Sequence, residues 1–236
     1  MPERPTSHNR ILSLLRNSDR ALLEPHLERV DLPLRKQLEG RNKCIDHAYF
    51  LEDGIASVVA NGTNDTSIEV GLIGSEGLTG LAIVMGMDRA AHSVYMQVAG
   101  TGHRIPAQAL RQAIDQSAQL QRIFLRFAHT FFIQATYTAL TNGRSKVEER
   151  LARWLLMAHD RVKRDELPLT HEFLAIMLGV RRAGVTTALK SLAEGGLIQQ
   201  RRSMIRIADR EGLKKASHGA YGPPELELEK IFGGKS

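Results

Sequence analysis

The fold is decided by the segment LTHEFLAIMLGV at residues 169–180 and the segment RRAGVTTALKSL that follows it at residues 181–192. Thr170 is a good N-cap for a helix, and Leu169 can pack on Leu174 as a hydrophobic staple. Gly179 stands where the chain must turn sharply before a second helix. The two segments therefore predict a helix-turn-helix.

The second helix, predicted over residues 181–193, has one apolar and one basic face. Its inward-facing residues recur at helical spacing and are Val185, Ala188, Leu189 and Leu192. Arg182, Thr186 and Lys190 are four residues apart and share the opposite face. Arginine can pair with guanine through two hydrogen bonds, and threonine and lysine can hold phosphates or base edges. The candidate DNA-contacting residues of this region are Thr170, Arg181, Arg182, Ala183, Thr186, Thr187, Lys190, Arg201 and Arg202.

A basic hairpin is predicted directly after this helix. Gly195-Gly196 ends the helix, and two strand-like runs follow at residues 197–200 and 204–207 around Arg201-Arg202-Ser203. Such a β wing can reach phosphates beside the groove. Many apolar helix pairs are purely structural, but a helix pair joined to a basic wing indicates DNA binding. We therefore predict a winged-helix DNA-binding domain over residues 145–215.

The positive charge lies in the same part of the chain. The 236 residues carry a formal net charge of +6, with an isoelectric point near 9.7. Residues 142–215 hold sixteen Lys and Arg against nine Asp and Glu, so this part carries +7 and the rest of the chain −1. A neutral domain fused to one that binds a polyanion would show this distribution. On charge alone, an ordinary basic protein with solvated lysines and arginines is the alternative.

The first half of the chain reads as a β domain with flanking helices. Apolar positions at helical spacing over residues 12–27 predict one or two short helices. Short strand-like runs follow at residues 48–51, 55–59, 68–73, 93–99 and 102–105. Asp53-Gly54 and Asn61-Gly62 are expected to close hairpins between them. We predict an antiparallel sandwich or barrel within residues 1–116.

A long helix is predicted over residues 117–141, with two apolar stripes. The first stripe is Leu120, Phe124, Phe127 and Phe131, and the second is Leu125, Ala128, Phe132, Ala135 and Ala139. Two adjacent apolar faces favour packing on the helix's own domain and also on a second subunit, so the first stripe is predicted to form a dimer contact. A central helix buried within one chain is the alternative.

Two further segments complete the domain plan. Asn142-Gly143 is expected to break the long helix, and another helix is predicted over residues 147–162 with Leu151, Trp154, Leu155 and Ala158 facing inward. Residues 216–236 contain Gly222-Pro223-Pro224 and are read as a mostly flexible tail.

Several function classes are disfavoured by what the sequence lacks. Cys44 is the single cysteine, so neither an internal disulfide nor a four-cysteine metal or iron–sulfur site is available. We read Cys44 as a buried core residue, with a redox-sensitive thiol as the alternative. No converging catalytic set is found, no metal site is expected, and His47, His92 and His103 are read as surface or packed residues. The chain shows no secretory signal or apolar run long enough to cross a membrane, so we expect a soluble cytoplasmic protein that is not an enzyme.

The layout over residues 12–213 resembles the CRP/FNR family of bacterial transcription regulators, most specifically over residues 169–198. The resemblance implies an α+β protein with an N-terminal cyclic-nucleotide-binding-like β roll, a long dimerisation helix and a C-terminal winged helix. The implied partners are double-stranded DNA, a second copy of the chain and possible contact with RNA polymerase. By the family pattern Arg182 is the leading base-contacting arginine, whereas Ala183 replaces a glutamate and Thr187 a second arginine. These departures change the expected target sequence but not the docking mode.

The resemblance also identifies a region where the family's cyclic nucleotide would bind. The compared residues are Glu76, Gly80, Leu81, Arg89, Ala91 and His92. Leu81 stands where members that bind cyclic AMP have a ribose-binding glutamate, and Ala91-His92 where they have the phosphate-binding Arg-Ser. Arg89 would substitute only if the loop slipped by two residues. An anion desolvated there would lack a partner, so the usual mode of cyclic AMP binding is not expected. No cofactor is identified, and the effector is unknown.

Three functions from different classes follow from the sequence. The one we favour is a dimeric regulator that reads a near-palindromic DNA site through residues 181–193. A cyclic-nucleotide-binding signalling module without transcriptional output is the alternative, and the basic helix and wing argue against it. An enzyme with an unrecognised site is the third.

Overall fold

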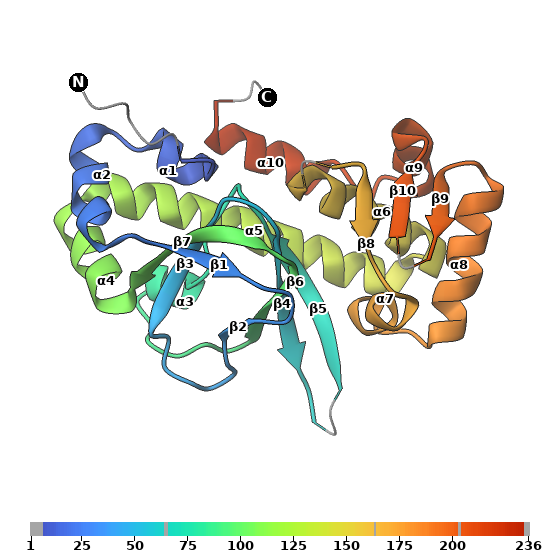
Figure 1. Ribbon diagram of the computed structural model, residues 1–236, viewed down its shortest axis with the longest axis horizontal. Coiled ribbons are helices and arrows are strands. Elements are labelled where there is room, and N and C mark those ends of the chain that lie inside the picture. Colours follow the sequence, from blue (N-terminus) through green and yellow to red (C-terminus); the bar gives the residue numbers. More distant parts are fainter. Residues whose placement is uncertain (1–6, 64–65, 163, 203, 234–236) are drawn as a thin grey trace.

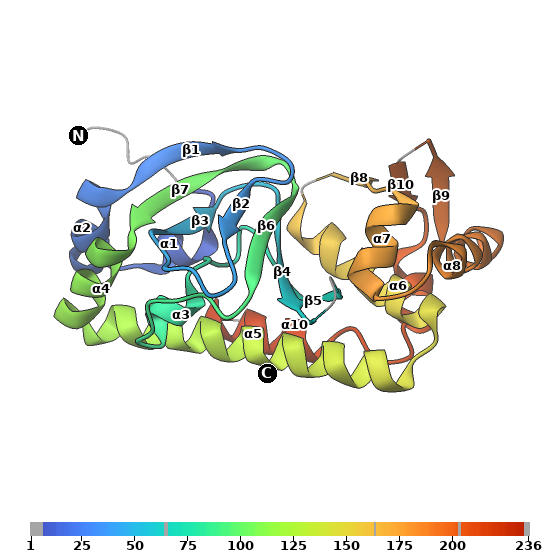
Figure 2. The same cartoon turned by 90° about the horizontal axis from the view of Figure 1, so that it is seen from below.

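A computed structural model describes residues 7–63, 66–162, 164–202 and 204–233. A β roll lies at one end and a small helical domain with a three-stranded sheet at the other, and a long helix runs beneath both (Figures 1 and 2). The last helix, α10, returns to the side of the N-terminal helix α1 (Figure 1). The α+β architecture predicted from the sequence is confirmed.

The β roll consists of two antiparallel sheets with short helices around them. One sheet has the order β1-β7-β3 and the other β2-β6-β4-β5. The strands are β1 (Glu28–Leu32), β2 (Gln37–Glu39), β3 (His47–Leu51), β4 (Ile55–Asn61), β5 (Ser67–Ile73), β6 (Ser93–Val98) and β7 (Gly100–Pro106). The helices are α1 (Arg10–Leu14), α2 (Asn17–Leu23), the 3-10 turn η1 (Glu24–His26), α3 (Leu81–Val84) and α4 (Ala107–Gln116). The five predicted strands are all present, whereas β1 and β2 were not predicted.

One of the two predicted hairpin turns has a different role. The Asn61-Gly62 segment does lead into a hairpin, since β4 pairs with β5 and the Gly62 amide donates to the Thr66 carbonyl at 2.7 Å. Asp53-Gly54 instead carries the chain from one sheet to the other, because β3 pairs with β7 and not with β4. Gly54 has φ of +83°, and a Cβ there would lie 2.6 Å from the Val98 carbonyl oxygen. The glycine is therefore required by a close approach between sheets.

The long helix α5 (Ala118–Arg144) begins where the sequence predicts and ends later. The Ser117 hydroxyl caps it by accepting from the Leu120 amide at 3.2 Å. Asn142-Gly143 does not break the helix, which continues until Ser145 donates to the Thr141 carbonyl at 2.9 Å. An internal glycine costs a helix only about 1 kcal/mol, so it does not have to end one.

The first apolar stripe of α5, which we predicted to form a dimer contact, packs mainly on the β roll of the same chain. Leu120, Phe124 and Phe127 are buried in the chain's own β-roll core, where the rings of Phe124 and Phe50 have centroids 6.0 Å apart. Phe131 is partly buried and packs against the same core. The β roll already covers Leu120, Phe124 and Phe127, so the structure contradicts a dimer contact for these three, whereas Phe131 keeps part of its surface exposed. In the second stripe, Leu125, Phe132 and Ala139 are exposed, and Ala128 and Ala135 are partly buried.

The C-terminal domain has a helical core and a three-stranded sheet. Its elements are α6 (Val147–Arg161), β8 (Glu166–Pro168), α7 (His171–Leu178), α8 (Arg182–Glu194), β9 (Ile198–Arg201), β10 (Met204–Ile207) and α9 (Arg210–Ala216). All four residues predicted to face inward from α6 are buried. The same apolar cluster includes Ile55, Leu72 and Val98 of the roll. A few roll residues therefore belong to the core of the C-terminal domain, while most of the roll forms a separate core of its own.

Residues 218–233 are not the flexible tail that we expected, and residues 234–236 of the predicted tail lie outside the described residues. The described part contains α10 (Pro223–Ile231), which packs along α5 and buries Ile231 against the β-roll core. Arg10 forms an ion pair with Glu229 at 2.7 Å, and Arg126 donates to the Lys230 carbonyl at 3.0 Å. We had expected this segment to be flexible from its composition. It is instead fixed by apolar residues at helical spacing and by its contacts with Arg10 and Arg126.

The structure also bears on the single cysteine, on membrane-spanning helices and on metal sites. Cys44 is exposed, so our interpretation of it as a core residue is wrong. None of the helices in the described residues combines the length and the apolar character that spanning a bilayer needs. Within the same ranges, no group of three or more His, Cys, Asp or Glu side chains could hold a metal ion.

A buried carboxyl links the roll to the C-terminal domain. Glu69 of β5 accepts from the Trp154 indole of α6 at 2.6 Å and from the Ser57 hydroxyl of β4. Burial raises the pKa of Glu69 from its ordinary 4.5 to about 7, although both hydrogen bonds and the charges of Arg161 and Arg153 oppose the rise. Between these two pKa values, the folded protein keeps a proton that the unfolded chain has lost.

Replacing Glu69 with glutamine is expected to remove a pH-dependent part of the stability. Because the folded pKa of Glu69 is the higher one, the free energy of unfolding falls as the pH rises from 4.5 to about 7 and is level above that. A shift of this size corresponds to at most about 3 kcal/mol. Urea unfolding of both proteins at several pH values checks this. A difference between wild type and Glu69→Gln that stays constant with pH would contradict it.

Candidate nucleic-acid interface

The first helix of the pair is capped as the sequence predicts. The Thr170 hydroxyl accepts from the Phe173 amide at 3.2 Å, and Leu169 and Leu174 are both buried. Gly179 ends α7 in the left-handed region, with φ of +60°. A Cβ on Gly179 would also lie 2.9 Å from Ile68 Cδ1, so the turn fits closely against the β roll. The helix-turn-helix is confirmed.

The second helix, α8, presents the two faces that were predicted. Its four apolar residues Val185, Ala188, Leu189 and Leu192 are buried. The residues on the outer side are all exposed, and they are Arg181, Arg182, Ala183, Thr186, Thr187 and Lys190. The buried face packs mainly on α6 and α7. A packed scaffold therefore holds a basic surface toward solvent, and contact of that surface with DNA stays a prediction.

The polar side chains on this face differ in whether they already form hydrogen bonds or ion pairs within the chain. The Thr186 and Thr187 hydroxyls donate to the helix carbonyls of Arg182 and Ala183, each at 3.1 Å. Lys190 lies 3.7 Å from Glu194, and both side chains are exposed, so this ion pair is weak. The Arg182 side chain makes no hydrogen bond or ion pair with any residue in the described ranges. Arg182 can therefore reach a ligand without breaking an existing contact.

The wing stands beside this face. Strands β9 and β10 pair with Arg201 opposite Met204, and Arg201 and Arg202 are exposed, whereas residue 203 lies outside the described residues. The wing sheet also contains β8, a third strand that was not predicted. A groove of about 610 Å³ runs between the start of α7, the start of α8 and the wing, and Thr170, Arg182, Arg201 and Arg202 line it. The structure thus brings these four predicted residues together.

Arg35 is a residue of this groove that sequence reasoning missed. It belongs to the turn between β1 and β2, in the other domain, and it lines the groove with the winged-helix residues. Its backbone has φ of +65°, held by an amide hydrogen bond to the Met96 carbonyl at 2.8 Å. No local pattern could have linked it to residues far along the chain.

The exposed stripe of α5 is a second candidate interface. Leu125, Phe132 and Leu140 are 41%, 63% and 56% exposed. Ala128 and Ala135 lie between them and are partly buried. Large apolar side chains gathered on one helix face usually mark a surface that another protein covers.

The residues compared with the family's nucleotide site do not form one cluster. Glu76 pairs with Arg161 of α6 at 2.8 Å and lines a cavity that contains none of the other five residues. Arg89 donates to the Asn42 carbonyl at 3.0 Å, and Ala91 and His92 are exposed. Gly80 and Leu81 open α3, where the Gly80 amide donates to the Glu39 carboxyl at 2.6 Å.

That carboxyl bears on the binding of anions. Glu39 is buried, and desolvation raises its pKa, although bonds from Gly80 and Thr79 oppose the rise. It already accepts from the Gly80 amide, so this backbone donor is not open to an anion. An anion near Gly80 would therefore meet a carboxyl in place of a cation.

Comparisons with known proteins bear on both domains. The Crp-like helix-turn-helix domain family matches residues 149–216. The chain is similar to FixK2 from Bradyrhizobium japonicum at 15% identity and a TM-score of 0.70, over 80% of this chain and 96% of that one. It is also similar to the c-di-GMP responsive global regulator CLP from Xanthomonas campestris at 19% identity and a TM-score of 0.62, over 81% and 99%.

A third structure with the same fold is TTHB099, a CRP family transcriptional regulator from Thermus thermophilus, at 17% identity and a TM-score of 0.61, over 81% of this chain and 96% of that one. At these identities the likeness is one of fold. A comparison with curated protein sequences finds no match. Residues 149–216 therefore carry a Crp-like helix-turn-helix domain, and most of the chain shares the fold of transcription regulators of the CRP/FNR type.

Proposed function

We propose that the protein reads a near-palindromic DNA site as a homodimer, with one copy of α8 in the major groove of each half-site. The observation that carries this proposal is the outer face of α8, where Arg182 is exposed and makes no hydrogen bond or ion pair with the described residues, while the opposite face is buried. Arginine in the major groove can pair with guanine O6 and N7. Arg201 and Arg202 of the wing would hold the neighbouring phosphates.

The exposed stripe of α5 supports the dimer. Across a two-fold axis, Phe132 of each copy would be covered by the same face of the other helix. Two recognition helices related in this way would lie about 34–36 Å apart, which is one turn of DNA. The expected site therefore consists of two inverted half-sites on one face of the duplex.

Selection of binding sites from random DNA tests this proposal. The selected sequences should share an inverted repeat, and gel shifts at increasing salt should show weaker binding as phosphate contacts are screened. Selected sequences without a common motif, bound no better than random DNA, would contradict sequence-specific reading. The same selection in the presence of candidate small molecules would identify those that change affinity.

Cyclic AMP at millimolar concentration is expected neither to bind tightly nor to strengthen DNA binding. Leu81 and Ala91 offer no charged partner for the nucleotide, and Glu39 occupies the Gly80 amide. Isothermal titration calorimetry measures the binding, and a gel shift on the same sample shows that the protein is active. A micromolar dissociation constant would mean that the loop carrying Arg89 rearranges to hold the phosphate.

A further inference from the structure

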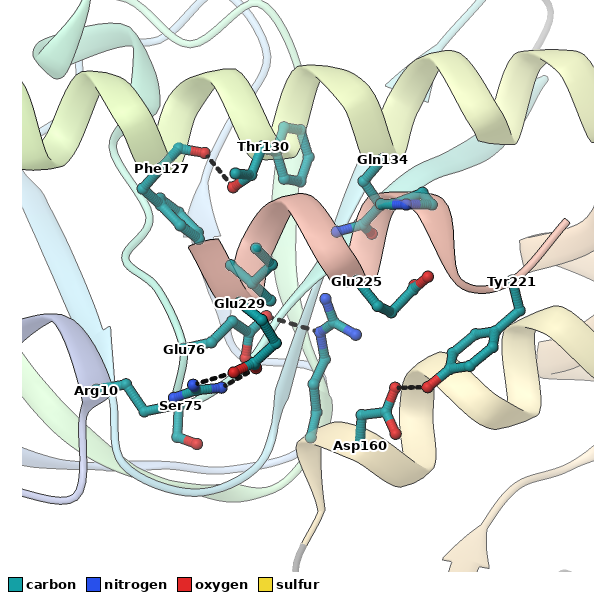
Figure 3. A pocket seen from close by; sticks show the side chains of 14 residues that line it. Arg10, Ser75, Glu76, Phe127, Thr130, Gln134, Asp160, Tyr221, Glu225 and Glu229 are labelled. Carbon is teal, nitrogen blue, oxygen red and sulfur yellow. Dashed lines mark hydrogen bonds and ion pairs between the residues drawn. The ribbon is translucent and has the colours of Figure 1, made fainter. Parts of the chain in front are cut away.

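A cavity of about 330 Å³ lies where the two domains and the C-terminal helix meet. Residues of α1, α5, α6 and α10 line it, together with Ser75 and Glu76 after β5 (Figure 3). Its volume is at the lower end of the range of small-molecule sites. Of the six residues compared with the family's nucleotide site, only Glu76 lines this cavity.

The cavity has an apolar wall and a charged wall. Phe127 and Phe131 of α5 and Leu228 of α10 form the apolar part. Two guanidinium groups and four carboxylates form the charged part, and they belong to Arg10, Arg161, Glu76, Asp160, Glu225 and Glu229. Such a lining suits a small molecule that has both an apolar body and polar ends.

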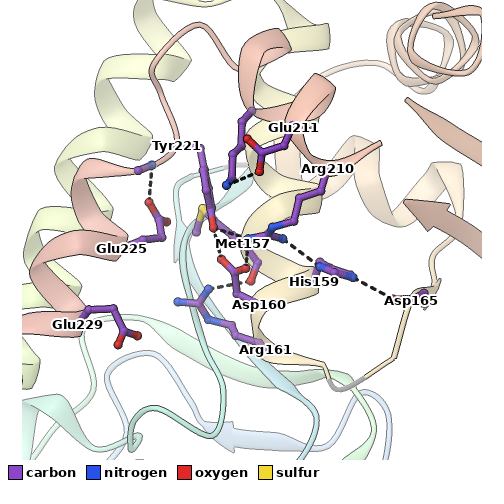
Figure 4. A network of polar contacts seen from close by, with 12 residues as sticks. Met157, His159, Asp160, Arg161, Asp165, Arg210, Glu211, Tyr221, Glu225 and Glu229 are labelled. Carbon is purple, nitrogen blue, oxygen red and sulfur yellow. Dashed lines mark hydrogen bonds and ion pairs between the residues drawn. The ribbon is translucent and has the colours of Figure 1, made fainter. Parts of the chain in front are cut away.

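Two of the carboxylates are already fully paired. The two oxygens of Glu229 accept from the two terminal nitrogens of Arg10, at 2.9 Å or less. The two oxygens of Asp160 accept from Arg210 and from the Tyr221 hydroxyl (Figure 4). These groups shape the wall and have little left to offer a ligand.

Arg161 is the buried cation that remains incompletely paired. Its side chain is 5% exposed, its Nε lies 2.8 Å from Glu76, and its Nη1 donates to the Met157 carbonyl at 2.8 Å. Its Nη2 has no hydrogen-bond partner in the described part of the chain. Arg161 extends toward the side of α10 that carries Glu225 and Glu229 (Figure 4). This Nη2 is not one of the fully buried, unpaired nitrogens, and Arg161 lines the cavity, so Nη2 can donate to an acceptor from outside the chain.

Glu225, like Glu76, has one carboxylate oxygen without a hydrogen bond in the described residues. Its Oε2 accepts from the Gly222 amide at 2.7 Å, at the start of α10. Its Oε1 has no hydrogen-bond partner among the described residues. The charge of Arg153 also interacts with the Glu225 carboxylate, but no hydrogen bond joins them. The three side-chain nitrogens of Arg153 donate instead to Ala220, Thr138 and Gln134. Arg161 Nη2 and Glu225 Oε1 therefore remain open as a donor and an acceptor, beside the Ser75 hydroxyl and Glu76 Oε2, in a cavity with an aromatic wall.

We propose that this cavity binds a small zwitterion with an apolar body, such as an apolar amino acid. The carboxylate would accept from Arg161 Nη2, the ammonium would donate to Glu225 Oε1, and the side chain would pack on Phe127 and Phe131. Because α6 and α10 both border the cavity, a bound molecule would change how the winged helix is held. This effect on DNA binding rests on the function proposed above, but the binding itself does not.

Calorimetry on the full-length protein tests the binding without DNA. The probes are L-phenylalanine, L-leucine and L-methionine, with phenylacetate and phenethylamine as analogues that lack one charge each. At least one amino acid should bind, and each single-charge analogue should bind at least tenfold more weakly than phenylalanine. No heat from any of the three amino acids would overturn the proposal. Equal affinity of phenethylamine or phenylacetate for the cavity would also overturn it.

A matched pair of variants on α10 places the site. Glu225→Gln keeps an oxygen for the Gly222 amide but removes the charge, so the affinity for the amino acid should fall at least tenfold. Glu227→Gln is the control, because Glu227 lies on the same helix, pairs with Lys230 and does not line this cavity. Unchanged affinity in Glu225→Gln would place the binding elsewhere. If amino acids bind but selected DNA is not found, the function proposed above fails while this site stands.

Discussion

Replacing Arg182 with alanine is expected to remove most of the sequence selectivity of DNA binding. A bidentate arginine–guanine contact is worth about 1–3 kcal/mol, or roughly five- to 150-fold in affinity. The Arg182 side chain makes no other polar contact in the described residues, so its loss should leave the fold unchanged. Competition gel shifts of the selected site against random DNA measure the selectivity ratio.

Arg16→Ala is a suitable control for this experiment. Arg16 is also an exposed arginine, but it lies before α2 in the β-roll half of the chain. The control removes the same charge and should leave the selectivity ratio unchanged. If Arg182→Ala retains the full ratio of the wild-type protein, α8 is not the element that reads base edges.

Replacing Phe132 with glutamate is expected to convert the protein to a monomer at micromolar concentration. Phe132 is 63% exposed on α5, and a two-fold interface would bury both copies. Burying a phenylalanine contributes about 1.5–3 kcal/mol, so losing two weakens the dimer by roughly 3–6 kcal/mol, before any repulsion between the new charges. Analytical ultracentrifugation measures the mass, and binding to the full palindrome should fall with it.

Leu34→Glu is the matched control for the dimer. The exposed fraction of Leu34 is 58%, which is similar to the 56% of Leu140 and the 63% of Phe132 on α5. Leu34 lies elsewhere, in the turn between β1 and β2. Its substitution should leave the mass at that of a dimer. A wild-type protein that is monomeric at these concentrations would show that the α5 stripe does not pair two copies.

The parts of the fold that local sequence specifies were predicted best. The Thr170 cap, the Gly179 turn and the spacing of Val185, Leu189 and Leu192 each depend on contacts within a few residues. Local patterns were enough to orient α8 because a helix face follows directly from residue spacing. Alternation and turn residues also marked the five predicted strands of the roll, whereas β1, β2 and β8 were missed.

Features set by distant contacts were not accessible in this way. Asp53-Gly54 looks like a hairpin turn, but sheet pairing depends on the whole roll, and the turn changes sheets instead. The two stripes of α5 are alike in sequence, so only the packing of the roll on Phe124 shows which one is left open. The helix α10 depends on partners more than ninety residues away, such as Arg126.

The candidate DNA surface shows the same division. Thr170, Arg182 and the wing arginines were found because they belong to one recognisable motif. Arg35 was not found, because only the docking of the two domains brings it to that groove. A surface built from two domains requires a structure before all its members can be named.

The apolar cluster that joins Ile55, Leu72 and Val98 to the winged helix bears on how the molecule unfolds. A fragment cut at Ser145 would leave water-exposed leucine and valine patches on both pieces, so neither half is expected to be a self-sufficient folding unit. Denaturation should therefore proceed as one concerted melting event with a single midpoint. Heat or proteolysis that loosens the roll would then inactivate the DNA-reading end at the same moment.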